Sequence, residues 1–267
     1  MKKAILVAII GAMTLGVNAG DWGKAPVAPA KAPIEECYDI GGEISAGYMS
    51  DYIFNGTRLA RDTVWSDVNY TIDSVVPITI GASYFNFINN GGVVADKLDL
   101  YASAALGTFA GFDTSLGYTH YFFPENNVGS LGDISLDLRR SLGFADLLLS
   151  TNYMVAGNNA ISGGWYHTAG FEKTIGLTDA VSLVLGAGVG YNDQYLAGAT
   201  ANFSGWSNYY ATAALPIELN CRATLTPYIG YNGSIYGTGG TQVSDLLGGA
   251  LSNGDVLNAG VSLSVSF

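Results

Sequence analysis

The sequence predicts an all-β fold, an up-and-down antiparallel transmembrane β-barrel of about twelve strands. Apolar residues make up 49% of the 267-residue chain and charged residues only 12%, about half the charged share that is usual in soluble domains. Beyond the N-terminal region, however, no segment is apolar for the ~18 residues that a transmembrane helix needs. Apolar and polar residues instead alternate with a period of two, and short and long connections take turns between the alternating segments.

Residues 1–19 are expected to be a secretory signal peptide. Lys2 and Lys3 precede an apolar stretch from Ala4 to Leu15, and Val17-Asn18-Ala19 supplies a small-x-small cleavage site. The apolar stretch is too short to favour a membrane anchor. A start with two lysines is typical of bacteria, so the expected destination is the periplasm, the outer membrane or the medium.

Residues 20–37, which alternate Ala with Pro, predict an extended periplasmic linker, and residues 38–267 form the expected barrel domain. Removal of the signal peptide takes away two lysines and no acids, so the mature net charge becomes 9 − 22 = −13. Such a charge argues against nucleic acid as a partner.

Twelve segments alternate as strands do, with one apolar and one polar face each. In chain order they cover Glu43–Phe54, Val64–Ile72, Ile78–Tyr84, Leu98–Leu106, Asp113–Phe122, Asp133–Arg139, Asp146–Val155, Trp165–Glu172, Ser182–Tyr191, Tyr209–Glu218, Leu225–Asn232 and Ala259–Phe267. Ten or fourteen strands also fit the pattern, because strand boundaries are its least certain part.

The connections predict that all short turns lie at one rim of the barrel and all long ones at the other. Short connections are expected near Asp73-Ser74, Ala110-Gly111, Gly143-Phe144, Gly176–Ala180 and Asn220–Arg222. Long ones are expected near Asn55–Asp62, Ile88–Asp96, Phe123–Gly132, Ala156–Gly163, Asn192–Ser207 and Gly237–Asp255. An even number of strands then leaves both ends of the barrel domain at the short-turn rim, where the linker joins it.

Alternation alone does not say which face points outward, because a soluble lipocalin-like barrel alternates too, with its apolar face inside. The polar face here consists of Gly, Ser and Thr with scattered acids, which suits a wet interior better than a solvated exterior. The apolar face carries aromatic residues near strand ends, which predicts two membrane-interface girdles. We assign Tyr52, Phe54, Tyr84, Phe122, Tyr153, Trp165, Tyr191, Tyr209 and Tyr231 to the long-loop girdle and Tyr70, Phe112, Phe171 and Phe267 to the other.

The polar face predicts an acidic pore lining, which would favour cations or neutral polar solutes over anions. The lining residues are expected to be Glu43, Asp51, Asp67, Asp99, Asp113, Asp137, Arg139 and Glu172, with Asp133, Asp146 and Glu218 on the same face. The alternatives are that these charges are paired or capped inside a plugged barrel, or that they are rim residues which face periplasmic water. Arg58 and Arg61, in the first long connection, are candidates to fold inward and pair with acids. Glycines on the polar face of residues 182–191 are expected to widen the pore.

Cys37 and Cys221 are the only cysteines, and both map to the short-turn rim. Because that rim faces an oxidising compartment, a disulfide is expected, with two free thiols as the alternative. The segment Gly237–Asp255 is the best candidate for a lumen plug or an external contact.

The sequence does not favour an enzyme, and no cofactor or metal is expected. His120 and His167 both fall on the outward face near the long-loop rim, without a partnered serine motif. The acids do not follow calcium-loop spacing, and no His/Cys cluster has the spacing of a zinc site. Interfacial histidines that accompany the aromatic girdle explain both residues.

The chain resembles bacterial outer-membrane β-barrels in its last strand, "LNAGVSLSVSF" (257–267), which alternates and ends on Phe267. In that class the terminal aromatic is an assembly signal, so the resemblance implies the barrel-assembly machinery as a partner during biogenesis. The first strand, "SAGYMSDYIFNG" (45–56), resembles the "SDY-aliphatic-F-R-G" opening of the TorF-type porin family, with Asn55 in place of the family's Arg. The resemblance implies a porin-like function.

These observations lead to an expected location in the outer membrane, in contact with its lipid. The expected function is passive diffusion of small hydrophilic solutes, with size exclusion by loops and a bias from a negative lining. The alternative is a non-conducting structural or adhesion barrel that acts through its surface loops.

Overall fold

The computed structural model describes residues 40–89, 96–124, 130–155, 163–195, 204–235 and 255–267. The signal peptide, the linker, Cys37 and most of Gly237–Asp255 lie outside these residues, so the expectations for them stay predictions. The described residues contain no helix of the length and hydropathy that crossing a membrane would require.

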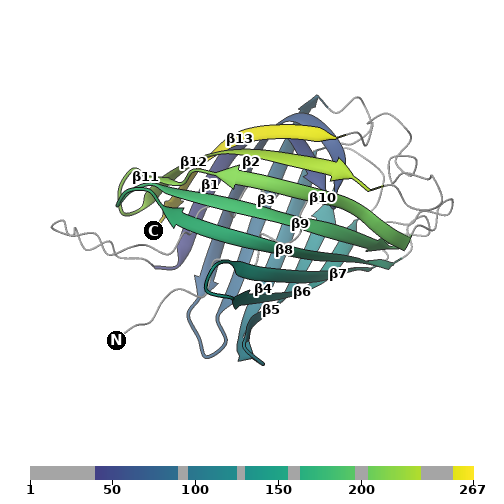
Figure 1. Cartoon of the computed structure of the whole chain (residues 1–267), viewed down its shortest axis with the longest axis horizontal. Helices are drawn as coiled ribbons and strands as arrows, with labels where there is room; N and C mark the ends of the chain where they lie inside the picture. The colour runs from purple at the N-terminus through teal and green to yellow at the C-terminus, as the bar shows by residue number, and fades with distance from the viewer. Residues whose placement is uncertain (1–39, 90–95, 125–129, 156–162, 196–203, 236–254) are drawn as a thin grey trace.

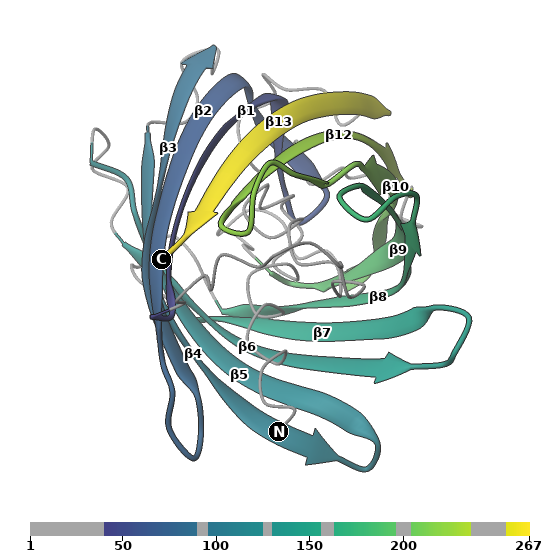
Figure 2. The ribbon, with the colours of Figure 1, turned by 90° about the vertical axis from the view of Figure 1, so that its left-hand side faces the viewer.

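The described chain is all-β and folds as one antiparallel sheet that closes into a barrel, which confirms the predicted fold class (Figures 1 and 2). The strands are β1 (Gly42–Phe54), β2 (Thr57–Ile72), β3 (Ile78–Asn89), β4 (Lys97–Phe109), β5 (Phe112–Phe122), β6 (Leu131–Ser141), β7 (Asp146–Val155), β8 (Gly164–Gly176), β9 (Ser182–Asp193), β10 (Ser204–Ala214), β11 (Ile217–Glu218), β12 (Ala223–Ser234) and β13 (Val256–Ser266).

The thirteen labelled strands occupy twelve places in the barrel wall. The two-residue strand β11 pairs with β12, as β10 also does, and it continues the line of β10 after a break at Leu215-Pro216. Proline has no N–H to donate to a ladder, which accounts for the break. The segment predicted as one strand over Tyr209–Glu218 is therefore one wall position in two pieces.

The seam of the barrel joins β1 to β13, from Glu43 opposite Ser266 to Met49 opposite Gly260. Phe267 extends the seam beyond β13. Its N–H donates to the Gly42 carbonyl at 2.9 Å, and its main-chain oxygen accepts from the N–H groups of Ile40 and Gly42 at 3.0 and 3.2 Å. The predicted pairing of the last segment with the first is thus correct.

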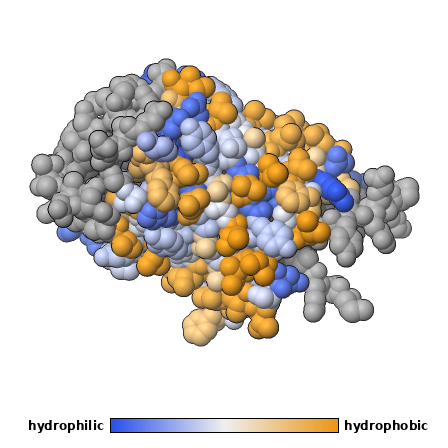
Figure 3. All heavy atoms as spheres, turned by 180° about the vertical axis from the view of Figure 1, so that it is seen from behind, coloured by the Kyte–Doolittle hydropathy of each residue, from blue (hydrophilic) through white to orange (hydrophobic). Residues whose placement is uncertain are grey.

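The apolar face of the wall points outward and the polar face inward, as expected for a membrane barrel. Ile44 is 51% exposed and Leu263 is 42% exposed, whereas Ser45 and Asp137 are each 2% exposed. Hydrophobic side chains are spread over the outside of the wall (Figure 3). So many exposed apolar side chains on one surface need an apolar environment around them, which a bilayer provides.

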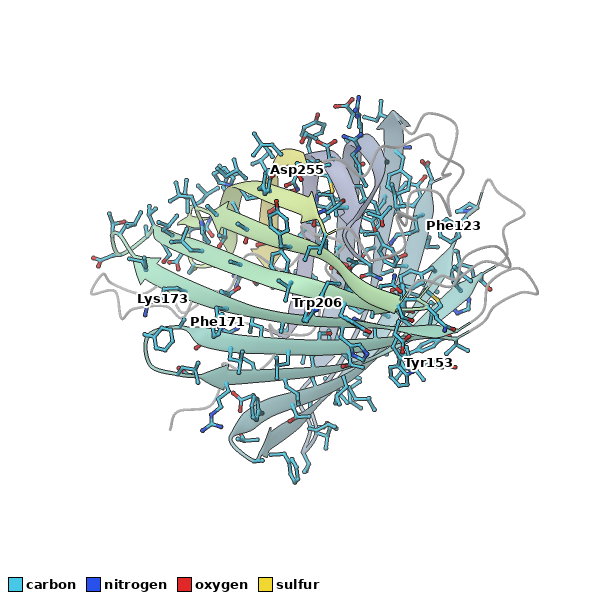
Figure 4. The ribbon with its side chains drawn as sticks, turned by 45° about the vertical axis from the view of Figure 1, so that its right-hand side comes forward. Phe123, Tyr153, Phe171, Lys173, Trp206 and Asp255 are labelled. Carbon is cyan, nitrogen blue, oxygen red and sulfur yellow. The ribbon has the colours of Figure 1, made fainter. Side chains whose placement is uncertain are left out.

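Aromatic side chains lie on the outer surface near both ends of the wall. Tyr84, Trp165 and Tyr209 are 39–44% exposed near the long-loop end, and Tyr70 and Phe171 are 45% and 50% exposed near the short-turn end. Figure 4 shows Phe171 and Lys173 toward one end of the wall and Tyr153 toward the other. The exposed aromatic side chains at the two ends of the wall agree with the two predicted membrane-interface girdles.

The assignment of Tyr52 and Phe54 to the outer girdle is wrong. Tyr52 is 0% exposed and Phe54 is 8% exposed, because the end of β1 does not follow the wall. The expected long connection over Asn55–Asp62 is also wrong: β1 and β2 are joined by the tight turn Asn55-Gly56, whose φ angles are 49° and 78°. Two successive residues with positive φ are typical of a type I′ hairpin turn.

Candidate functional site: the barrel interior

The candidate site is the inside of the barrel, where the polar faces of the strands meet. At the short-turn end, the guanidinium of Arg139 on β6 joins the carboxylates of Asp146 on β7 and Glu172 on β8. Arg139 Nε donates to Asp146 Oδ2 at 2.9 Å, and Arg139 Nη2 lies 3.2 Å from Glu172 Oε1. All three side chains are about a quarter exposed. One predicted lining cation thus holds two acids, which matches the alternative of paired interior charges.

Further along the interior, Asp67 and Asp137 accept hydrogen bonds from neighbouring strands. Asp67 on β2 accepts from Ser83 Oγ at 2.5 Å and from the Tyr101 hydroxyl at 2.9 Å. Asp137 on β6 accepts from Ser150 Oγ at 2.6 Å. These donors are neutral, and no ion pair with either carboxylate is found among the described residues, so both acids contribute negative charge to the inner face.

The inward glycines of β9 do not widen the interior, contrary to expectation. The Tyr210 hydroxyl of β10 lies 2.3 Å from the position that a Cβ of Gly188 would take and 2.4 Å from that of Gly170 on β8. Side-chain atoms of Tyr166 and Asn208 lie similarly close to the position that a Cβ of Gly190 would take. The glycines are therefore places where rings from neighbouring strands lie flat against the wall.

Toward the long-loop end, the β1–β2 hairpin leaves the wall and turns into the barrel. The ladder of β1 with β13 ends at Met49, and the ladder of β2 with β3 starts at Arg61. A bulge between Tyr52 and Ile53 and a positive φ of 50° at Asp62 supply the bend. We call Asp51–Ala60 the inner hairpin.

The tip of the inner hairpin contacts the wall on the far side of the seam. Asn232 Nδ2 of β12 donates to the Gly56 carbonyl at 3.0 Å, and it is itself bonded to Asn208 of β10. Within the hairpin, Arg58 Nη1 lies 3.4 Å from Asp51 Oδ1. The proposed inward pairing of Arg58 with an acid is therefore correct, whereas Arg61 is exposed.

Three aromatic side chains from widely separated parts of the wall meet in the interior. Phe54 of the inner hairpin lies 5.7 Å from Tyr121 of β5 and 6.3 Å from Tyr195, two residues past β9, measured between ring centroids. In the ring order β1-β2-β3-β4-β5-β6-β7-β8-β9-β10-β12-β13, strands β1, β5 and β9 are four places apart from one another. These contacts bring together side chains that come from three sides of the barrel interior.

Asp133 of β6 ties two of these rings together. Its Oδ2 accepts from the Tyr121 hydroxyl at 2.8 Å and also from the Tyr195 hydroxyl. Burial, and next the neighbouring Asp133 carboxylate, raise the pKa of Tyr195 well above its usual value. The hydroxyl therefore stays protonated and remains a donor.

Lys97, the first residue of β4, sits beneath the inner hairpin and is 2% exposed. Its Nζ lies 4.8–5.0 Å from the centroids of four rings, those of Tyr52, Phe54, Phe85 and Tyr121. Its charge is paired with Asp99 Oδ2 at 2.8 Å, and it donates to the Tyr52 hydroxyl. Two of the four rings belong to the inner hairpin and two to the wall.

The predicted lining residues thus divide into groups. Arg139 and Glu172 are brought together, Asp51 pairs with Arg58, and Asp99 pairs with Lys97. Asp67 and Asp137 have hydroxyl partners, Asp113 accepts from Thr108 at 2.6 Å, and Glu43 lies at the seam opposite Ser266.

Cys221, in the turn between β11 and β12, is not a free thiol, and its predicted partner Cys37 lies outside the described residues. Within the described part of the chain, no group of three or more His, Cys, Asp or Glu side chains is placed to hold a metal.

Two features of the interior were missed by the sequence reasoning although signals for them exist. Asn-Gly after an alternating segment is the strongest short-range hairpin signal, and it stands at Asn55-Gly56. Lys97 has the same parity as Asp99, Tyr101 and Ser103, so period-two alternation places it on the inner face. The caging of Lys97 has no local signal, because its four rings come from three separate strands, β1, β3 and β5.

Comparison with solved structures shows the same kind of fold. An outer membrane channel from Pseudomonas putida F1 matches with a TM-score of 0.53 and 10% sequence identity, covering 90% of this chain and 100% of that one. The KdgM porin (TM-score 0.48, 9% identity, 84% and 99% covered) and the NanC porin (TM-score 0.47, 13% identity, 85% and 100% covered) also match. No protein-family model and no curated protein matches the chain, so the resemblance of its first strand to TorF-type porins stays a prediction. The comparison therefore supports one conclusion, that the chain has the fold of an outer-membrane β-barrel.

Proposed function

We propose that the protein is a porin-like channel of the bacterial outer membrane through which small hydrophilic solutes diffuse passively. The observation that carries this proposal is the contrast between the two faces of a twelve-place barrel. The outside is apolar and girdled by aromatics, whereas the inside carries carboxylates, amides and hydroxyls. An interior of this kind has polar groups to replace the hydration of a passing solute.

The expected preference is for cations or neutral solutes. Asp67 and Asp137 have only neutral hydrogen-bond donors among the contacts described above, and the cations Arg139, Arg58 and Lys97 each pair with an acid. Net negative charge on the inner face raises the local concentration of cations and repels anions. The roles of outer-membrane lipid and of the barrel-assembly machinery as partners, and the absence of catalysis, belong to the same proposal.

A non-conducting structural barrel is the second candidate, and one observation favours it. The rings of Phe54, Tyr121 and Tyr195, which come from three sides of the barrel, meet at the level of the inner hairpin. Where these rings block the interior, a channel requires that the hairpin moves or leaves a narrow path beside it.

Reversal potentials in planar bilayers test the proposal. The purified protein is placed between two potassium chloride solutions of different concentration, and ion-selective currents are expected with a reversal potential of the sign that indicates potassium preference. The double variant Asp67→Asn and Asp137→Asn should reduce that preference. Absence of any current over repeated insertions would reject the channel in favour of the structural barrel.

A further inference from the structure

We propose that Lys97 is a latch that holds the inner hairpin across the barrel, and that the hairpin is the movable gate of the channel. The gating part of this inference rests on the proposed channel function, whereas the latch can be tested without it. Lys97 acts here by positioning the hairpin and not by contact with a solute.

The inner hairpin has no ladder to the wall on either side. Between Met49, where pairing with β13 ends, and Arg61, where pairing with β3 starts, β1 and β2 form a backbone ladder only with each other. The segment is nevertheless buried, with Tyr52 and Ala60 at 0% exposure. Side-chain contacts, and not backbone pairing, must therefore keep it inside.

Lys97 contacts the hairpin from the β4 side. Its ammonium faces the rings of Tyr52 and Phe54 from the hairpin and the rings of Phe85 and Tyr121 from the wall. A cation between aromatic faces attracts each of them, most strongly where water is excluded. The same ammonium thus bridges the movable segment to β3 and β5.

At the hairpin tip, the described contacts with the wall are polar. The Gly56 carbonyl accepts from Asn232 at 3.0 Å, and the Asn208 amide lies beside the position that a Cβ of Gly56 would take. The base carries a further bond at the outer surface, from the Tyr48 hydroxyl to Asp62 at 2.6 Å. The bulge supplies a hinge, and no backbone ladder holds the hairpin among the described residues, so loss of the Lys97 contacts should release it.

The test uses the full chain with Asn55→Cys at the hairpin tip, folded in lipid vesicles, and measures labelling by a bulky hydrophilic maleimide. Asn55 is 5% exposed, so labelling should be slow. Adding Lys97→Met, which keeps the aliphatic stem but removes the ammonium, should raise the labelling rate by about tenfold or more. The matched control Lys173→Met changes an exposed lysine of β8 and should leave the rate unchanged. The same chain without Asn55→Cys gives the background from the native cysteines.

An unchanged labelling rate with Lys97→Met overturns the latch. Lys97→Met also leaves the Asp99 carboxylate without its cation, so the double variant Lys97→Met and Asp99→Asn is measured as well. A return to slow labelling in the double variant would assign the effect to Asp99 and would overturn the latch. If neither variant yields a folded, heat-modifiable band on gels, the double variant Tyr52→Leu and Phe54→Leu is used, because it removes two of the four rings around Lys97. The latch then requires the same increase in the labelling rate. Currents from these samples test the channel separately: fast labelling without current in any variant retains the latch and rejects the proposed function.

Discussion

Removal of Phe267 should weaken the barrel at its seam. The deletion eliminates three main-chain hydrogen bonds, at 2.9, 3.0 and 3.2 Å, each with a net value of about 1 kcal/mol. The Phe267 ring is 36% exposed and covers Gly42, so its partial burial contributes about 1.5 kcal/mol. The deletion should therefore lower the free energy of unfolding by about 4–5 kcal/mol, and Phe267→Ala, which keeps the backbone bonds, by about 1.5 kcal/mol.

The assay is urea unfolding of the barrel in lipid vesicles, followed by tryptophan fluorescence. Phe109→Ala is the matched control, because Phe109 is 79% exposed at the turn between β4 and β5, and it should change stability by less than about 0.5 kcal/mol. A deletion variant as stable as the parent chain would refute the reasoning, since the seam would then not depend on its last residue. The same deletion should also impair assembly in cells, and normal surface levels would contradict the assembly-signal prediction.

Three further results are expected. Arg139→Met should leave the carboxylates of Asp146 and Glu172 without their cation, which should lower the free energy of unfolding by about 1–2 kcal/mol. The reversal potential should shift toward stronger cation preference. An unchanged reversal potential would mean that this cluster lies off the conducting path. Gly188→Val should cost about 1–3 kcal/mol in urea unfolding, because a tyrosine hydroxyl occupies its Cβ position, whereas Gly176→Ala, with nothing within 4 Å of its Cβ position, should be tolerated. Cys37 and Cys221 should form a disulfide, seen as different gel mobility with and without reductant, and free alkylation of both thiols would disprove it.

The wall of the barrel could be predicted from sequence because its physics is local and periodic. Adjacent residues of a strand point to opposite faces, so the outward direction of Ile44 and the inward direction of Ser45 follow from alternation and the identity of the solvent on each side. The pairing of the last strand with the first follows from an equally simple rule, closure of the sheet. The break at Pro216 is not among the predictions, although the missing N–H of proline accounts for it.

The interior could be predicted only in part, because it depends on contacts between distant segments. Alternation placed Asp67 and Asp137 inside, but it does not say that Arg139 would hold Asp146 and Glu172. Tyr52 and Phe54 were assigned to lipid because alternation assumes that a strand stays in the wall.

The departure of the inner hairpin depends on a bulge and on one positive φ at Asp62. Neither feature changes the polar and apolar pattern of the sequence. The hairpin turn itself was readable from Asn55-Gly56, whereas its inward direction is set by Lys97 and by rings on β3, β5 and beyond β9, which no local pattern brings together.

In the proposed channel, the inner hairpin closes a polar path through the barrel. Single-channel conductance is to be compared between the full chain and Phe54→Ala, which removes the ring that meets Tyr121 and Tyr195. We expect small or rare openings for the parent chain and clearly larger or more frequent ones for the variant. Equal conductance in both would contradict closure by the hairpin, and silence in both would contradict the channel itself.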